Sequence, residues 1–461
     1  MAEHAQYKTS VLPVDVSKIG RLQAVPQSED VLDTLYFQLD EQSEDAQSLR
    51  LAARRLQTSD IPVSFPTETV YGLGADATRS SAVQGIYKAK QRPSDNPLIV
   101  HFASLDQLRA VLRPPPFTET HVNGHVQIDE SVDPIPDIYK PVIKKFWPGP
   151  LTIILPNPPN SPLAPEVTAG LPTFGARIPR HVLALALIKL ANVPIAAPSA
   201  NASTQPSPTA AEHVAYDLNG RIETIIDGGP CDVGVESTVV DGLSQPPLIL
   251  RPGGISIEQL RSCSGWENTE IGYKNAAEID SQPRAPGMKY RHYAPKATVV
   301  LFEADKPPPS RFELCKFLGP NRKLGLIRTK HWRFRTDNES YPVYATTDSQ
   351  ENNSPPPGEH SQAYTLGFAG LLETLQSSRQ PREVLQTHAI QGGGSLKLAI
   401  VDICLGTDVG DIARGIFAAL RELDKEDVDA ILVEGIDDAE GETAAAIMNR
   451  LRKAAEVKIT R

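Results

Sequence analysis

Short apolar segments alternate with amphipathic helical segments along most of this chain, and this alternation restricts the chain to α/β folds. Beyond residue 297 the alternation is regular, which predicts a doubly wound parallel sheet. The strands predicted there are 298–302, 324–328, 396–402 and 428–434, and the helices are 310–317, 364–374, 411–424 and 443–457. Between residues 45 and 262 shorter predicted strands mix with crossing helices, which indicates a separate α/β domain.

The length of 461 residues exceeds what one hydrophobic core usually serves, so two domains are expected. We predict an N-terminal lead-in over residues 1–44, a first domain over 45–262, a linker over 263–297 and a second domain over 298–461. Two polar, proline-rich insertions interrupt the domains at 113–137 and 329–362.

Charge and cysteine content argue against several classes of protein. A net charge of −10 argues against a protein that grips nucleic acid over a broad basic face, although a local patch is compatible with it. The four cysteines are far apart, form no CxxC pair and fit a reducing compartment. We find no apolar run long enough to span a membrane and no signal or transit pattern. A cytoplasmic protein without a membrane span is expected, and the sequence leaves a mitochondrial copy open.

The stretch from residue 62 to residue 101 carries most of the chemistry. Its pattern predicts a strand, a sharp turn at Gly72 and Gly74, a helix capped by Ser80 or Ser81, and a second strand.

Three cations, Lys88, Lys90 and Arg92, gather near the end of this predicted helix. A solvated helix end, where cations complement the macrodipole, is one explanation. The other is an anion site, in which lysine acts as a point charge and arginine as a planar fork on phosphate oxygens. The pattern alone does not decide between them.

Motif searches exclude several familiar sites. The P-loop pattern GxxxxGK[ST] is absent, because Gly229 and Gly234 have the right spacing but Val235 stands where lysine is required. The patterns HExxH and GxSxG are also absent, and no GxGxxG opens a helix after a strand in the second domain. Any ATP chemistry in this chain therefore needs a phosphate-binding arrangement other than these motifs.

Four motifs together resemble the YrdC/Sua5 family of L-threonylcarbamoyl-AMP synthases. They are Pro66-Thr67-Glu68-Thr69-Val70-Tyr71-Gly72-Leu73, Lys90-x-Arg92, Ser199-x-Asn201 and Gly234-Val235-Glu236-Ser237-Thr238. The chain looks like the long, Sua5 form, which adds a C-terminal domain. The resemblance implies a YrdC-like twisted sheet with helices, followed by a Rossmann-like three-layer α/β domain, and a linker segment at 285–295 that folds over the active site as a lid.

The resemblance also implies the reaction. L-threonine, bicarbonate (or CO2) and ATP would give L-threonylcarbamoyladenylate and pyrophosphate, the first step in forming N6-threonylcarbamoyladenosine at position 37 of tRNA. A downstream transferase would pass the product to tRNA, and direct contact with tRNA would be weak at most. Mg²⁺ is expected to arrive with the ATP phosphates, since no dedicated carboxylate cage is visible in the sequence.

Site residues follow from the matching motif positions. Those implied for ATP, mostly its phosphates, are Lys90, Arg92, Asn96, Thr173, Ser199, Asn201, Ser207 and Arg251, with Tyr293 of the linker closing on the nucleotide. Lys90 and Arg92 are also the implied catalytic pair. The positions implied for L-threonine are Thr67, His101, Arg177 and Ser237, with Ala197 offering backbone.

Each assignment has a simpler structural alternative. Ser199 and Asn201 could cap a turn, and Thr67 after a proline could serve only turn chemistry. His101 could be a strand histidine whose hydrogen bonds are all made within the protein. Arg177 could form a surface ion pair that adds little to stability. The acids Glu68 and Glu236 are tempting acid/base candidates, yet each could only brace a loop.

Three other functions compete with the synthase. A non-catalytic module that binds tRNA or double-stranded RNA would use the basic cluster, but the acidic total charge counts against it. A sugar-phosphate enzyme resembling dihydroxybutanone-phosphate synthase would need clustered acids with metal. A carbamoyl-transfer subunit of the hydrogenase-assembly type would need zinc-finger cysteines, which the sequence lacks.

Overall fold

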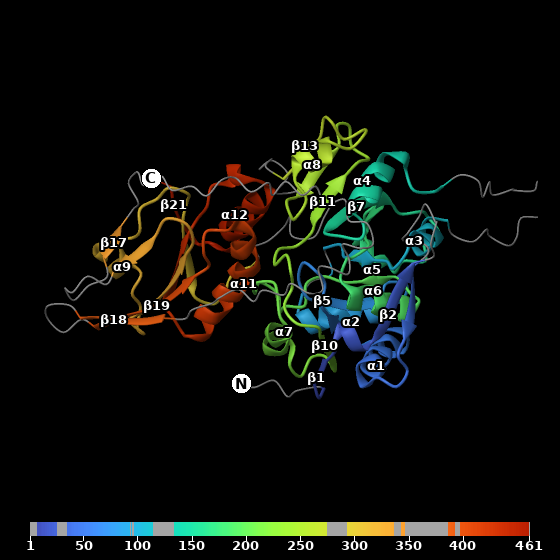
Figure 1. Cartoon of the computed structure of the whole chain (residues 1–461), viewed down its shortest axis with the longest axis horizontal. Coiled ribbons are helices and arrows are strands. Elements are labelled where there is room, and N and C mark those ends of the chain that lie inside the picture. Colours follow the sequence, from blue (N-terminus) through green and yellow to red (C-terminus); the bar gives the residue numbers. More distant parts are fainter. Residues whose placement is uncertain are drawn as a thin grey trace, which may run out of the picture. The chain divides into compact units, whose positions relative to one another are not determined.

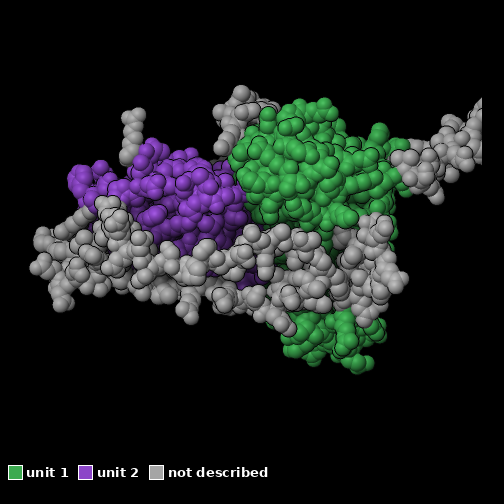
Figure 2. Space-filling view, turned by 45° about the horizontal axis from the view of Figure 1, so that its top comes forward, with its two compact units in different colours: residues 1–202, 210–229, 237–289 green, residues 203–209, 230–236, 290–461 purple. Residues whose placement is uncertain are grey.

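The computed structural model describes residues 7–24, 35–92, 94, 96–113, 133–273, 293–335, 343–345, 386–391 and 397–460. The chain divides into two compact units, which Figure 2 colours separately. Unit 1 comprises residues 1–202, 210–229 and 237–289, and unit 2 comprises residues 203–209, 230–236 and 290–461. Two short segments from the half that carries the motifs therefore belong to the unit formed mainly by the C-terminal half.

A mixed sheet of eleven described strands forms the centre of unit 1, in the order β1-β10-β4-β5-β9-β6-β8-β7-β11-β12-β13. The strands are β1 Ser10–Pro13, β4 Val63–Phe65, β5 Gly72–Asp76, β6 Ile99–His101, β7 Leu151–Pro156, β8 Thr173–Arg177, β9 Ile195–Ala196, β10 Thr224–Asp227, β11 Thr238–Asp241, β12 Leu248–Arg251 and β13 Glu270–Ile271. Within the predicted lead-in, β1 pairs in parallel with β10, and β2 (Gly20–Ala24) pairs with β3 (Leu35–Leu39) as a separate antiparallel ribbon.

Helices of unit 1 are α1 Glu44–Thr58, α2 Ser80–Lys90, α3 Leu105–Leu112, α4 Lys140–Phe146, α5 Pro165–Thr168, α6 Val182–Ala191, α7 Ala211–Leu218 and α8 Ile257–Arg261, with 3-10 turns at Val16–Lys18 and Asp137–Tyr139. The N-cap Ser43 accepts a hydrogen bond from the Ala46 N–H, and two acids follow in the first turn of α1. Apolar residues of α1 and α6 pack with Val63 and Phe65 of β4 into one buried cluster.

The central stretch differs from its sequence prediction at two places. Gly72 and Gly74 lie inside β5, which pairs antiparallel with β4, rather than in a sharp turn. A Cβ at Gly74 would lie 2.6 Å from the ring of Phe65 and 2.8 Å from Ile195 Cγ2, so glycine is needed there for close packing.

Helix α2 also begins differently from the prediction. Its N-cap is Arg79, which makes no side-chain capping bond, and Ser80 is already helical. The helix ends at Lys90 because Gln91 adopts a left-handed conformation with φ 51°. The predicted serine cap was therefore wrong, while the predicted end near Arg92 was right to within two residues.

A second sheet, of six described strands, forms unit 2, in the order β18-β19-β15-β20-β14-β21. Its strands are β14 Thr298–Phe302, β15 Lys323–Arg328, β18 Gln386–Gln391, β19 Lys397–Cys404, β20 Ala430–Glu434 and β21 Val457–Ile459. All neighbouring pairs are parallel except β18 with β19, so the predicted parallel sheet is confirmed with an antiparallel edge strand. Within the second predicted insertion, β16 (Arg333–Arg335) and β17 (Val343–Ala345) form an antiparallel pair.

Three layers make up unit 2. Its described helices are α9 Arg311–Lys316, α11 Val409–Lys425 and α12 Glu442–Ala454, with a 3-10 turn at Asp438–Glu440. Figure 1 shows α11 and α12 side by side, and their apolar residues form one cluster with Val299 and Leu301 of β14. The alternate β14 residues Val300 and Phe302 pack instead with Leu314 of α9, because successive strand side chains point to opposite faces.

Some predictions fall outside the described residues. These are the helix at 364–374, most of the first insertion, and the linker segment at 285–295 apart from its last three residues. Across the part of the chain that is described, no helix is both long and apolar enough to cross a membrane.

Candidate active site

Lys90 is buried at the end of α2, with 3% of its surface exposed, and bonds to the Ser199-x-Asn201 motif. Its Nζ donates to the carbonyl oxygens of Ser199 (2.5 Å) and Asn201 (2.6 Å), and lies 3.3 Å from Asn201 Oδ1. The Ser199 hydroxyl donates to the same Oδ1 at 2.5 Å. Two motifs more than 100 residues apart in the chain therefore share one buried ammonium group.

The loop with Ser199 also lies against the start of β5. Leu73 N–H donates to the Pro198 carbonyl and Ala200 N–H donates to the Tyr71 carbonyl, each at 2.8 Å. These bonds join the first motif to the third, so three of the four motifs meet around Lys90.

The two lysines of the basic cluster fit different explanations of those that the sequence left open. Lys88 is exposed and fits a solvated helix end, whereas Lys90 is buried and does not. Tyr87 fixes the backbone that follows, since its carbonyl accepts from Arg92 N–H at 3.0 Å and its hydroxyl donates to the Asn96 carbonyl at 2.9 Å. This tyrosine is a positioning residue that the motifs did not reveal.

Arg177, at the end of β8, forms a buried ion pair with Glu68. Its guanidinium donates to Glu68 Oε1 at 2.6 Å, to Thr69 Oγ1 at 3.0 Å and to the Gly149 carbonyl at 3.2 Å. The side chain is 5% exposed and that of Glu68 is 1% exposed, so the surface-pair alternative is wrong. Among the described contacts, three of the five guanidinium N–H groups are used, which leaves two for a ligand carboxylate.

Glu68 braces the loop as well as the arginine. Its other carboxylate oxygen accepts the Arg180 backbone N–H at 3.0 Å. Burial raises the pKa of Glu68, but the charges of Arg177 and Arg180 outweigh it and hold that pKa below its usual value. A carboxylate kept ionised in this way suits bracing, and it is a poor general acid near neutral pH.

Thr67 stabilises a turn, as in the simpler alternative considered from the sequence. Its Oγ1 donates to the Val70 carbonyl at 2.6 Å and accepts from the backbone N–H groups of Thr69 and Val70, each at 3.2 Å. The side chain is buried. In this arrangement it shapes the loop that presents Glu68 and Thr69 to Arg177.

His101 ends β6 and lies opposite Arg177 in the parallel register of β6 and β8. Burial, and after it the charge of Arg177, lower the pKa of His101 from 6.5 to about 3. The imidazole is therefore neutral at physiological pH. Its Nδ1 is buried without a hydrogen-bond partner in the described part of the protein, so the fold leaves this one ring nitrogen unsatisfied.

This neutral histidine predicts a loss of stability in acid. Between its ordinary value of 6.5 and about 3, the unfolded chain binds a proton that folded His101 does not. The unfolding free energy should fall as the pH falls, by up to about 1.4 kcal/mol per pH unit. We expect His101→Asn to lose about 2–3 kcal/mol less than the wild type between pH 7 and pH 4.5.

Urea unfolding followed by circular dichroism at the two pH values measures this difference. His181, whose pKa is lowered to about 4 by burial, adds a loss of its own in both proteins and cancels in the comparison. Glu68 contributes stability above its ordinary pKa that is lost only at still lower pH, since its folded pKa is lowered. Equal losses in the wild type and the variant would contradict a neutral buried His101.

Ser237 and Arg251 form a third buried cluster. Arg251, at the end of β12, donates from Nε to the Ser237 carbonyl at 3.1 Å and from an Nη to its hydroxyl at 3.0 Å. The same hydroxyl lies 2.8 Å from Thr152 Oγ1 of β7. A predicted ATP residue and a predicted threonine residue are thus in direct contact.

The remaining predicted residues lie elsewhere. Ala197 follows β9, where its N–H donates to the Ile99 carbonyl at 2.9 Å. Thr173 starts β8, four residues before Arg177, and is half-buried. Ser207 and Tyr293 belong to unit 2, where Tyr293 is buried and stacks on Phe417 with ring centroids 5.3 Å apart.

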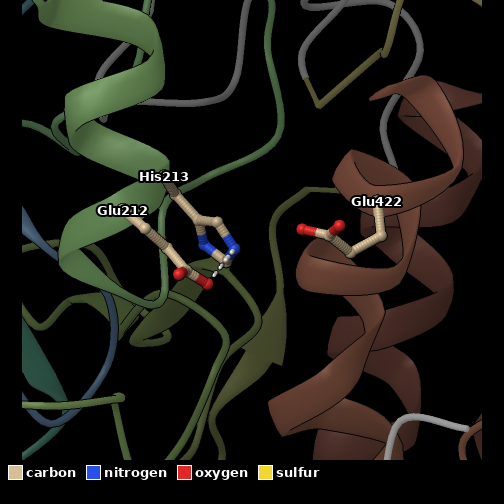
Figure 3. A group of neighbouring side chains, drawn as sticks. All are labelled: Glu212, His213 and Glu422. Atoms are coloured by element: carbon tan, nitrogen blue, oxygen red, sulfur yellow. Dashed lines mark ion pairs between the residues drawn. The ribbon is translucent and has the colours of Figure 1, made fainter. Parts of the chain in front are cut away.

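Figure 3 draws a group of possible metal ligands, Glu212, His213 and Glu422. Glu212 and His213 are neighbours on α7 in unit 1, with His213 Nε2 3.9 Å from Glu212 Oε1. Glu422 belongs to α11 in unit 2, where it accepts from Lys425 at 2.6 Å. Because neither unit alone supplies all three ligands, we assign no metal centre to this group.

Unit 1 therefore gathers buried cations from distant segments. Lys90, Arg177 and Arg251 are each at most 5% exposed, and Glu68 is the carboxylate that offsets one of them. Buried positive charge of this kind favours anionic ligands such as phosphates and carboxylates.

Comparison with known proteins assigns the family. A family model described as "Telomere recombination" (Sua5, YciO and YrdC) matches residues 56–253, and one described as "Threonylcarbamoyl-AMP synthase, C-terminal domain" matches residues 255–456. The threonylcarbamoyl-AMP synthase of Schizosaccharomyces pombe is 45% identical over 421 residues, which cover 90% of each chain. The chain belongs to the Sua5 family of threonylcarbamoyl-AMP synthases.

Further members of the Sua5 family agree. The threonylcarbamoyl-AMP synthase of Bacillus subtilis is 38% identical over 424 residues, 92% of this chain and 97% of its own. The structure of Pyrococcus abyssi Sua5 complexed with L-threonine matches with a TM-score of 0.65 and 32% identity, over 98% of this chain and 100% of that chain. The resemblance seen in the motifs, and the two-domain α/β fold it implied, are confirmed.

Proposed function

We propose that this enzyme condenses L-threonine, bicarbonate (or CO2) and ATP into L-threonylcarbamoyladenylate and pyrophosphate. The observation that carries the proposal is buried Lys90, which joins the Lys-x-Arg and Ser-x-Asn motifs in a member of the Sua5 family. The relationship over nearly the whole chain favours this synthase over a module that only binds RNA.

The chemistry requires alignment and charge stabilisation more than a protein nucleophile. The threonine amine adds to CO2, and an oxygen of the resulting carbamate attacks the α-phosphorus as the bond to pyrophosphate breaks. Lys90, Arg92 and Arg251 would take up the charge that develops on the phosphate oxygens. Asn96, Thr173, Ser199, Asn201, Ser207 and Tyr293 are proposed to complete the ATP site.

Threonine would bind at the Arg177 end of the site. The two guanidinium N–H groups not used by Glu68, Thr69 and Gly149 suit its carboxylate. The buried Nδ1 of neutral His101 would accept a hydrogen bond from the threonine amine or hydroxyl. Thr67, Ser237 and the backbone of Ala197 are proposed as the further contacts.

Mg²⁺ is proposed to enter with ATP. The buried carboxylate Glu68 is already committed to the Arg177 side chain and the Arg180 backbone. Phosphate oxygens, rather than a protein cage, would therefore hold the ion. When bound, it neutralises phosphate charge alongside the lysine and arginines.

The cellular setting is also a proposal. The four cysteines are free thiols, which suits the reducing cytosol. A separate transferase would consume the adenylate and modify tRNA. This chain would need no strong tRNA contact of its own.

The test is incubation of the purified protein with ATP, Mg²⁺, L-threonine and labelled bicarbonate. Pyrophosphate release that needs both threonine and bicarbonate, with label in an AMP adduct, is expected. ATP turnover indifferent to threonine would contradict the proposal. Salt-sensitive tRNA binding without turnover would favour the RNA-binding module instead.

A further inference from the structure

Two segments of the motif-bearing half are built into unit 2. Segment 203–209 begins two residues after the predicted site residue Asn201, and segment 230–236 directly precedes Ser237. Unit 2 otherwise consists of residues 290–461.

Glu236, the acid of the fourth motif, is held by an arginine of the C-terminal half. Arg450 of α12 donates from Nε to Glu236 Oε2 at 3.0 Å, and the Ser207 hydroxyl donates to Glu236 Oε1. Arg450 is 1% exposed and Ser207 is fully buried. The carboxylate therefore ties both segments to α12 by one buried ion pair and one hydrogen bond.

Further contacts fix the same segments within unit 2. Arg421 of α11 donates to the Pro206 carbonyl, and Ala294 N–H donates to the Thr204 carbonyl at 2.8 Å. Val235 is fully buried in the cluster formed by α11, α12 and the sheet.

Gly234 allows the closest approach to α11. Its φ is +79°, and a Cβ there would lie 2.3 Å from the Ala413 carbonyl oxygen. The three nearest atoms all belong to the backbone of Ala413 and Arg414, which leaves no room for a side chain, so packing on α11 explains the motif glycine.

We propose that the C-terminal half sets the ATP affinity of the active site, with Arg450 and Arg421 acting as positioning residues. They hold segments 203–209 and 230–236, which continue without interruption into Asn201 and Ser237. If the segments were released, ATP binding would have to order them, and that cost would weaken the observed affinity. This inference rests on the proposed function for its ligand.

Truncation of Arg450 tests the proposal in the full-length protein. We expect Arg450→Ala to weaken ATP binding, measured by titration calorimetry, at least tenfold, and to change the Kd for L-threonine less than threefold. Arg450→Lys keeps a cation for Glu236 and should stay within threefold of the wild type for ATP. Hydrogen exchange should show segments 203–209 and 230–236 losing protection in Arg450→Ala.

Arg328→Ala is the matched control. Arg328 also lies in unit 2, where it donates twice to buried Asp402, each at 2.7 Å, and once to the Trp332 carbonyl at 3.3 Å. This variant should lose stability without losing ATP affinity. Equal weakening of ATP binding in Arg328→Ala and Arg450→Ala would overturn the proposal, because general destabilisation would then explain both.

Glu236→Gln provides a second variant if Arg450→Ala does not fold. The amide keeps the shape of the side chain but removes the charge that Arg450 faces, so weaker ATP binding is again expected. Unchanged ATP affinity in this variant would overturn the proposal. A wild type that binds ATP but forms no adduct would contradict only the proposed synthase activity, since the affinity ratios still test the anchoring.

Discussion

Replacing Lys90 with alanine should abolish ATP-dependent synthesis, with a loss of at least about 10²–10³-fold in turnover, because it removes the preorganised cation that we propose for the phosphates. The substitution should also reduce stability by about 1–3 kcal/mol, since the buried carbonyls of Ser199 and Asn201 lose their donor. Pyrophosphate release and thermal unfolding measure the two effects separately.

Lys88→Ala is the control for charge and helix position. Lys88 lies two residues earlier on α2 but is exposed, so turnover and stability should both remain close to wild type. Normal turnover in Lys90→Ala, or an equal loss in Lys88→Ala, would contradict the assignment of Lys90 to the ATP site.

The buried pair of Glu68 and Arg177 should show strong energetic coupling. Either single alanine substitution leaves one charge buried without its partner, which typically costs about 3–5 kcal/mol. Removing both charges should cost much less than the sum of the two single substitutions. Urea unfolding of both single variants and the double variant gives this coupling energy.

Activity measurements should distinguish the roles of Glu68 and Arg177, which stability measurements alone do not. We expect the double variant to recover stability but not threonine-dependent synthesis, since the guanidinium that would bind the threonine carboxylate is gone. Glu68→Gln should keep more activity than Arg177→Ala, because the amide can still accept from Arg177. Additive losses of stability in the double variant would show that the two side chains do not act as a pair.

Much of the architecture follows from local pattern. Strand β14 has the predicted bounds, Thr298–Phe302, and α11 and α12 begin within two residues of their predicted starts. The periodicity of apolar residues depends only on neighbours along the chain, so it can be recognised from the sequence alone. The prediction of a serine N-cap for α2 was wrong. Ser80 is of a residue type that suits an N-cap, but it is the first helical residue.

The candidate site was predictable as a set of residue types but not as contacts. Motif resemblance named Lys90, Arg177 and Ser237, yet could not say whether Glu68 and Glu236 perform acid/base chemistry or brace loops. The structure gives both a cationic partner, Arg177 for Glu68 and Arg450 for Glu236. No spacing signal links partners that lie more than 100 residues apart.

The sequence by itself determined the α/β class, the two-part organisation and the family, and it named the cations that we propose for the ATP and threonine sites. Tertiary structure decided which cation is buried, which acid neutralises which base, and that segments 203–209 and 230–236 pack with the C-terminal half. The physical reason is that residue type and periodicity are local properties. Burial and pairing depend instead on which distant strands and helices the fold brings together.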